Sequence, residues 1–151
     1  MEILDYYTLT ADQQSAVRAR LGQSEWRAAA YLRGLLERNG LRALYGASTR
    51  LLLGMEGQTL AAFCTLAERD EIDDTDLAPW IGFVYTYPEF RGCRRSGALI
   101  DRACALAKAE GHEYSYISTD HVGLYEKYGF EYVTTMQTRH GDDTRVYKKR
   151  I

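Results

Sequence analysis

Residues 80–111 read WIGFVYTYPEFRGCRRSGALIDRACALAKAEG, and this stretch joins a strand, a basic loop and a helix. Residues 80–86 are mostly β-branched or aromatic, which favours a strand, and Pro88 ends that strand because it lacks a backbone N–H donor. Beyond the loop, apolar residues recur at helical spacing: Leu99, Ile100, Ala103, Leu106 and Ala107. Gly111 supplies a left-handed C-terminal stop for this predicted helix.

The loop between strand and helix, residues 91–97, reads RGCRRSG and carries three arginines. A loop that leads into a helix N-terminus presents unpaired backbone N–H groups and the positive end of the helix dipole, and both suit phosphate. Guanidinium groups add forked donors that match phosphate oxygens. The pattern predicts a phosphate site, with an ordinary solvated surface loop as an equal alternative.

The strand after this helix is predicted over residues 114–119. A strand–helix–strand unit of this length places its two strands in parallel, with a right-handed crossover. Ligands in open α/β sheets bind outside the carboxyl ends of such strands. We therefore expect residues 86–96, Asp120 and His121 to surround one crevice.

Local patterns predict the remaining elements. Thr10 and Gln13 form a capping box, which begins a helix. The other expected elements are a strand over 1–9, helices over 10–22 and 26–40, a hairpin of strands 50–55 and 59–67, a short helix holding Tyr125, and a final hairpin over 133–151.

The composition bounds the class of protein. The length of 151 residues, with 46% hydrophobic and 26% charged residues, predicts one domain over 1–151. The net charge of −2 gives no general attraction to nucleic acid or to a membrane surface, and no apolar run approaches membrane-spanning length. The N-terminus lacks a signal-peptide pattern, and Cys64, Cys93 and Cys104 lack metal-site spacing. We expect a cytoplasmic protein with reduced thiols and no metal.

An acidic run, residues 68–76, contains six carboxylates and one arginine. Such a run is usually a solvated loop between strands, and this is the interpretation that we favour. The alternative is that the run attracts a cationic amine.

The second half of the chain resembles the GCN5-related N-acetyltransferases, the GNAT superfamily. Residues 123–130, GLYEKYGF, are similar to the family's Leu-Tyr-Glu-Lys-x-Gly-Phe segment. The family's phosphate loop reads Arg or Gln, two residues, Gly, one residue, then Gly or Ala; Arg91 fits its first position, whereas Arg94 and Ser96 replace the two glycines. The resemblance implies an α/β (α+β) fold, in which helices flank a mixed, mostly antiparallel twisted sheet whose central parallel strand pair is splayed around the cofactor.

The resemblance also implies a reaction, the direct transfer of an acetyl group from acetyl-CoA to the primary amine of a small molecule. Backbone groups of Val84, Tyr85 and Thr86 would bind the pantetheine arm. The implied phosphate and further cofactor contacts are Arg91, Gly92, Cys93, Arg94, Arg95, Ser96, Gly97 and Ser118, the last lying seven residues before Tyr125. The side chain of Arg94 is expected to contact phosphate in place of a glycine backbone.

Tyr125 matches the family's tyrosine that points at the cofactor sulfur. With a pKa near ~10, a tyrosine is neutral at pH 7 and can give a proton to a departing thiolate. Asp120 and His121 are candidates for the general base, with a capping role as an equal alternative. Cys93 has no adjacent His, which argues against a covalent acetyl intermediate.

Two other functions stay open from the sequence. The acceptor can be a protein or peptide N-terminus instead of a small molecule. The loss of both loop glycines also allows a catalytically weak acyl-CoA-binding regulatory module, although Tyr125 argues against it. A homodimer is compatible with either function.

Overall fold

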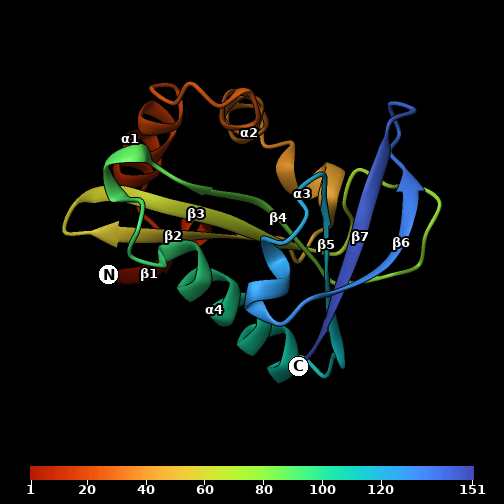
Figure 1. Cartoon of the computed structure of the whole chain (residues 1–151). Helices are drawn as coiled ribbons and strands as arrows, with labels where there is room; N and C mark the ends of the chain where they lie inside the picture. Colours follow the sequence, from red (N-terminus) through yellow and green to blue (C-terminus); the bar gives the residue numbers. More distant parts are fainter.

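A seven-stranded sheet runs through the computed structural model, which describes residues 1–151 (Figure 1). The strands are β1 (Glu2–Asp5), β2 (Arg50–Glu56), β3 (Thr59–Ala67), β4 (Trp80–Thr86), β5 (Tyr114–Thr119), β6 (Glu131–Gln137) and β7 (Asp143–Arg150), in the order β1-β2-β3-β4-β5-β7-β6. Every neighbouring pair is antiparallel except β4 and β5, which are parallel. The predicted mixed, mostly antiparallel sheet with one central parallel pair is confirmed.

Helices cover both faces of the sheet. They are α1 (Ala11–Leu21), α2 (Arg27–Glu37), α3 (Leu41–Tyr45) and α4 (Arg95–Ala109), with 3₁₀ turns η1 (Tyr6–Thr8), η2 (Pro88–Phe90) and η3 (Tyr125–Tyr128). In Figure 1, α1 and α2 lie on one side of the sheet and α4 lies on the other. The predicted capping box begins α1: Thr10 Oγ1 accepts from Gln13 N–H at 3.2 Å, and Gln13 Oε1 accepts from Thr10 N–H at 2.9 Å.

The two faces of the sheet build two separate hydrophobic cores. Because side chains alternate along a strand, Leu51 and Leu53 pack into the core with α1 and α2, whereas Leu52 packs into the core with α4. The side chains of α4 that were expected to form its apolar stripe are buried against the second core, apart from the partly buried Leu106.

The structure corrects the sequence prediction at two places. The strand expected over residues 1–9 ends at Asp5, because the Asp5 carboxylate accepts a hydrogen bond from Tyr7 N–H at 3.1 Å and begins a 3₁₀ turn. The short helix α3 was not predicted. No helix of the chain combines the length and apolar character needed to span a membrane.

The parallel strands β4 and β5 part soon after they meet. Their only register pair joins Trp80 to Tyr116, so the edge of β4 beyond Trp80 has no strand partner on the β5 side. Between the register pairs Thr65–Gly82 and Phe63–Tyr85, β3 has one residue and β4 has two, which is a β-bulge. Phe83 lies in this bulge with φ of +49°.

We expect the alanine substitution of Gly46, which ends α3, to destabilise the fold strongly. Gly46 has φ of +120°, and a Cβ there would lie 2.2 Å from Glu68 Oε2 and 2.7 Å from Glu68 Cβ. Gly57→Ala is the matched control, because Gly57 has φ of +60° and open space around it. Urea unfolding should show a loss of about 2 kcal/mol or more for Gly46→Ala and about 1 kcal/mol for Gly57→Ala; equal losses would contradict the steric argument.

Candidate active site

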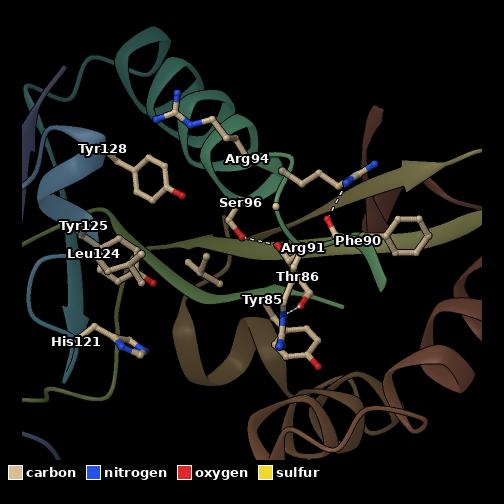
Figure 2. A pocket seen from close by; sticks show the side chains of 13 residues that line it. Tyr85, Thr86, Phe90, Arg91, Arg94, Ser96, His121, Leu124, Tyr125 and Tyr128 are labelled. Carbon is tan, nitrogen blue, oxygen red and sulfur yellow. Dashed lines mark hydrogen bonds between the residues drawn. The ribbon is translucent and has the colours of Figure 1, made fainter. Parts of the chain in front are cut away.

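A cleft of about 540 Å³ opens where β4 and β5 part, between the end of β4, the first turn of α4 and η3 (Figure 2). The structure brings together ten of the residues expected at the site: Val84, Tyr85, Thr86, Arg91, Gly92, Arg94, Arg95, Ser96, His121 and Tyr125. Cys93, Gly97, Ser118 and Asp120 do not line this cleft. We call it the cofactor cleft, after the molecule that the sequence predicts there.

One wall of the cofactor cleft is the open edge of β4. Val84, Tyr85 and Thr86 lie past the last residue that pairs with β5, so no strand pairs with this edge of β4. The Thr86 carbonyl accepts from Arg91 Nε, and the other backbone groups that face this side are free for a ligand. An extended ligand arm can bind such an edge as an added strand would, with hydrogen bonds to the main chain. The amide groups of a pantetheine arm fit this edge.

The opposite end of the cleft is the N-terminus of the fifteen-residue helix α4. Its N-cap, Arg94, makes no side-chain capping bond, and the backbone N–H groups of residues 92–97 have no capping or loop partner. The hydroxyls of Thr86 and Ser96 lie 2.6 Å apart and tie the end of β4 to this first turn. The free N–H groups and the helix dipole fit the pyrophosphate that the sequence predicts here.

The three loop arginines have different surroundings. Arg91 Nε donates to Thr86 O at 3.0 Å, and Arg95 donates to Glu56 Oε1 at 2.9 Å and to Phe90 O at 2.7 Å. Arg94 is exposed, has no hydrogen-bond or ion-pair partner, and runs along α4 away from Thr86 in Figure 2. It is the loop arginine whose guanidinium is free of protein contacts.

Tyr125 is 7% exposed, and Figure 2 shows its ring pointing from η3 into the cofactor cleft. Burial, followed by the influence of Cys64 and Tyr128, raises the pKa of Tyr125 to about 12. Burial also raises the pKa of the Cys64 thiol to about 12, so both groups keep their protons at neutral pH. The Tyr125 hydroxyl makes no hydrogen bond within the chain, so it is free to donate its proton to a ligand.

A second hollow, of about 370 Å³, lies beside the same strands toward α2 and α3. Five carboxylates line it, and we call it the acidic pocket: Asp70, Glu71, Asp120, Asp142 and Asp143. Along β4, Gly82 and Phe83 line the acidic pocket and residues 84–86 line the cofactor cleft. Along β5 and its following loop, residues 118–120 line the acidic pocket and His121 lines the cleft. The two hollows therefore adjoin where the strands part.

Asp70 is the functional candidate that the sequence did not identify. The acidic run was predicted to be solvated, which holds for the exposed Asp73, Asp74 and Asp76 but not for the buried Ile72 or the partly buried Asp70. Ile72 packs with Trp80 and Val146 and draws the loop inward. An apolar residue inside an acidic run is the one signal in the sequence that could have indicated that part of the run is buried.

The Asp70 carboxyl group lies against β4 at the start of the bulge. Its Oδ1 would be 3.1 Å from a Cβ built on Gly82. Burial raises the pKa of Asp70 to about 6, and the nearby Glu71 carboxylate adds to this effect; hydrogen bonds from Glu71 N–H and the Ser118 hydroxyl, together with Arg139, oppose it. A carboxyl group with a pKa near neutrality can both hold and release a proton at working pH.

The other candidates lie apart from one another. Asp120 is exposed in the acidic pocket, and the exposed His121 lines the cofactor cleft, where its carbonyl accepts from Tyr147 OH at 3.3 Å. Ser118, expected at the cofactor, lines the acidic pocket and has its hydroxyl 2.9 Å from that of Thr144. Cys93 is an exposed free thiol. No group of three or more His, Cys, Asp or Glu side chains is placed to hold a metal ion.

Comparison with known proteins identifies a protein family that matches this chain. The family model described as "Acetyltransferase (GNAT) domain" matches residues 41–133, which is more than half of the chain. The fold is similar to that of an acetyltransferase from Streptococcus agalactiae 2603, with a TM-score of 0.67 and 17% identity over 99% of this chain and 98% of that one. No curated protein sequence gives a significant match.

Two further solved structures share this fold. A GNAT family acetyltransferase from Elizabethkingia anophelis with acetyl-CoA bound has a TM-score of 0.59 and 17% identity, over 74% of this chain and 82% of that one. An aminoglycoside 6'-acetyltransferase type Ii has a TM-score of 0.65 and 14% identity, over 99% of this chain and 97% of that one. At these identities the likeness is one of fold.

Substitutions of Arg94 separate its backbone from its side chain. Arg94 has φ of +56°, a left-handed conformation that costs a non-glycine residue free energy. Arg94→Gly and Arg94→Ala remove the same guanidinium, but only glycine removes this cost, so the glycine variant should be more stable than the alanine variant by about 1 kcal/mol in urea unfolding. If the guanidinium contacts phosphate, calorimetry should show acetyl-CoA binding weakened by roughly 1–3 kcal/mol in the alanine variant and by less in the glycine variant. Equal affinity of all three proteins would show that Arg94 points to solvent.

Proposed function

The chain belongs to the GNAT family of acetyltransferases, and from this premise we propose that it moves an acetyl group from acetyl-CoA directly to the primary amine of a small molecule. The observation that carries the proposal is the protonated, unpaired hydroxyl of Tyr125, which lies in a cleft between a free strand edge and a helix N-terminus. A thioester bound along that edge would have a proton donor beside its sulfur.

The cofactor cleft would supply the contacts that acetyl-CoA needs. The β4 edge at residues 84–86 would bind the pantetheine amides, and the N–H groups of Gly92 and of residues 94–96 would bind the pyrophosphate. A free N–H group of β4 that faces the thioester oxygen would stabilise the negative charge that develops as the acceptor attacks. The Elizabethkingia protein, which holds acetyl-CoA on a similar fold, supports this assignment.

The acceptor would enter from the acidic pocket, because that hollow adjoins the cofactor cleft where β4 and β5 part. A neutral amine nitrogen attacks the thioester carbonyl, the tetrahedral adduct collapses as the C–S bond breaks, and Tyr125 gives its proton to the sulfur. The attacking nitrogen loses one proton, for which Asp70 is the partly buried acceptor on the same side. The aminoglycoside acetyltransferase among the structural neighbours makes a small amine the first acceptor class to test.

The alternative of a weak regulatory module rests on the missing loop glycines. Arg94 nevertheless adopts the left-handed conformation that a glycine would favour, and the first turn of α4 keeps its free N–H groups. These observations favour a catalytic domain.

Tyr125→Phe tests the proposed reaction. The variant should bind acetyl-CoA nearly as the wild type does, because the proton is needed only when the thiolate leaves, while turnover falls about 100-fold or more. Tyr128→Phe is the matched control, since Tyr128 lies on the same turn and lines the same cleft. Acetyl-CoA binding would be measured by calorimetry and turnover by thiol release with a panel of amines. Failure of wild-type protein to bind acetyl-CoA would refute the function, and equal turnover of both variants would remove Tyr125 from the acid role.

Asp70→Asn tests the proton acceptor through pH. A raised pKa means that the folded chain binds the Asp70 proton more tightly than the unfolded chain does, so this residue makes stability fall as pH rises from ~4 to about 6. Asp70→Asn should therefore raise the melting temperature at pH 8 relative to wild type and change it little at pH 4.5. In the wild type, kcat/KM should fall below about pH 6, and this acidic limb should vanish in the variant along with most of the activity.

Asp120→Asn and His121→Gln are the comparison variants for this experiment. If the acidic limb disappears with either of them and persists with Asp70→Asn, the base is that residue and not Asp70.

A further inference from the structure

We infer that the acceptor is a small, elongated amine that carries a second positive charge, held by the carboxylates of Asp142 and Asp143 at the mouth of the acidic pocket. This inference rests on the proposed function and narrows its substrate class. It starts from four observations: the charge of the pocket, an unpaired hydroxyl on a lining residue, the aromatic walls, and the positions of Asp70, Asp142 and Asp143.

The charge of the acidic pocket exceeds what one ammonium group requires. Its lining includes five carboxylates and no Lys or Arg side chain, and its remaining titratable groups are His140, which is exposed, and the buried Tyr45. Arg139 is not among the lining residues, although its guanidinium carbon lies 5.9 Å from the ring centre of Tyr45; its Nη2 lies 3.3 Å from Asp73 Oδ1 and donates to Asp70 O at 2.9 Å. Like charges gathered in one concave site repel one another until a cation binds, so the pocket favours a ligand with more than one positive charge.

A buried polar group in the pocket independently indicates a ligand. Tyr45 lines the pocket, is 3% exposed, and its hydroxyl has no hydrogen-bond partner in the chain. Leaving a buried hydroxyl unpaired costs free energy, and a ligand nitrogen could supply the missing bond.

The pocket walls also suit a cation. Trp26 lines the pocket and is held in place by stacking on Tyr85, with ring centroids 5.0 Å apart and planes at 5°. Phe83 lines it too and packs edge-on against Tyr45 at 5.8 Å. Aromatic faces attract ammonium groups, and they provide apolar contact for a methylene chain between two such groups.

The positions of the carboxylates in the acidic pocket indicate how long the acceptor is. Asp70 lies against Gly82, one residue before the bulge and next to the stretch of β4 that lines the cofactor cleft. Asp142 and Asp143 are exposed; Asp142 lies in the turn between β6 and β7, and Asp143 is the first residue of β7. An amine that reacts beside Asp70 therefore places its far end near the turn, where those two carboxylates can bind a second ammonium group.

A charge series of acceptors with one chain length tests the inference. The four probes are butylamine, aminobutanol, diaminobutane and aminobutyrate, whose far ends are apolar, neutral polar, cationic and anionic. Thiol release should show kcat/KM for diaminobutane about ten- to a hundred-fold above that for butylamine, the range of a charge-assisted hydrogen bond. Aminobutyrate should be the poorest acceptor, and the preference should shrink at high salt.

The double variant Asp142→Asn, Asp143→Asn connects the preference to this surface. The ratio of kcat/KM for diaminobutane to that for butylamine should fall toward one in this variant. Asp74→Asn is the matched control: Asp74 is exposed in the same acidic run as Asp70 but lines a different hollow with Ile72 and Met136, so the ratio should stay at its wild-type value.

The outcomes separate this inference from the proposed function. Equal use of butylamine and diaminobutane would overturn the second-charge inference and leave the acetyltransferase function intact. A preference that survives the double variant would overturn the assignment to Asp142 and Asp143. If acetyl-CoA binds but only a peptide amine is acetylated, the small-amine class is wrong; if acetyl-CoA does not bind, the proposed function fails as well.

Discussion

The parting of β4 from β5 is the constraint on which the rest of the structure depends. Backbone N–H and C=O groups are costly to leave unpaired, and a central strand normally satisfies them on both sides. Here β4 loses its β5 neighbour after Trp80 and carries a bulge on its β3 side, so its last residues have main-chain groups that a ligand can bind. Trp80 is 1% exposed, and its indole N–H donates to Leu77 O at 2.6 Å, which fixes the point where the strands separate.

Two hydrophobic cores lie on opposite faces of the sheet beside this gap. Tyr85 and Phe83 pack against the core with α1 and α2, whereas Val84 packs with Tyr125 and Phe130 against the core with α4. In the proposed reaction, the cofactor would lie on the side of α4 and η3, the acceptor would lie on the side of α2 and α3, and their reacting atoms would meet between the strands. The two hollows share no lining residue, and they lie next to each other where β4 and β5 part.

The sequence predicted which residues gather in the cofactor cleft far better than which gather in the acidic pocket, and the reason is physical. The cofactor cleft is built from contiguous segments, residues 84–96 and 121–128, whose strand, helix-start and tyrosine patterns are local. The acidic pocket is assembled from Trp26, Tyr45, the acidic run and the β6–β7 turn, which are distant in the chain. The burial of Asp70 depends on the packing of Ile72 with Trp80 and Val146, a nonlocal contact that no local periodicity reveals.

One physical effect, burial, would prepare both proposed proton-transfer groups. Burial disfavours the charged form of any acid, so it raises the pKa of Tyr125 to about 12 and that of Asp70 to about 6. The consequences differ because the starting values differ: Tyr125 stays protonated and can only donate, whereas Asp70 moves close enough to neutrality to accept a proton and release it again. A donor on the thioester side and an acceptor on the amine side are what a direct transfer across the parted strands requires. In the proposed reaction, the stability that the chain gives up by burying the Asp70 carboxylate would be a cost of function, which would account for a residue unfavourable to the fold in the acidic pocket.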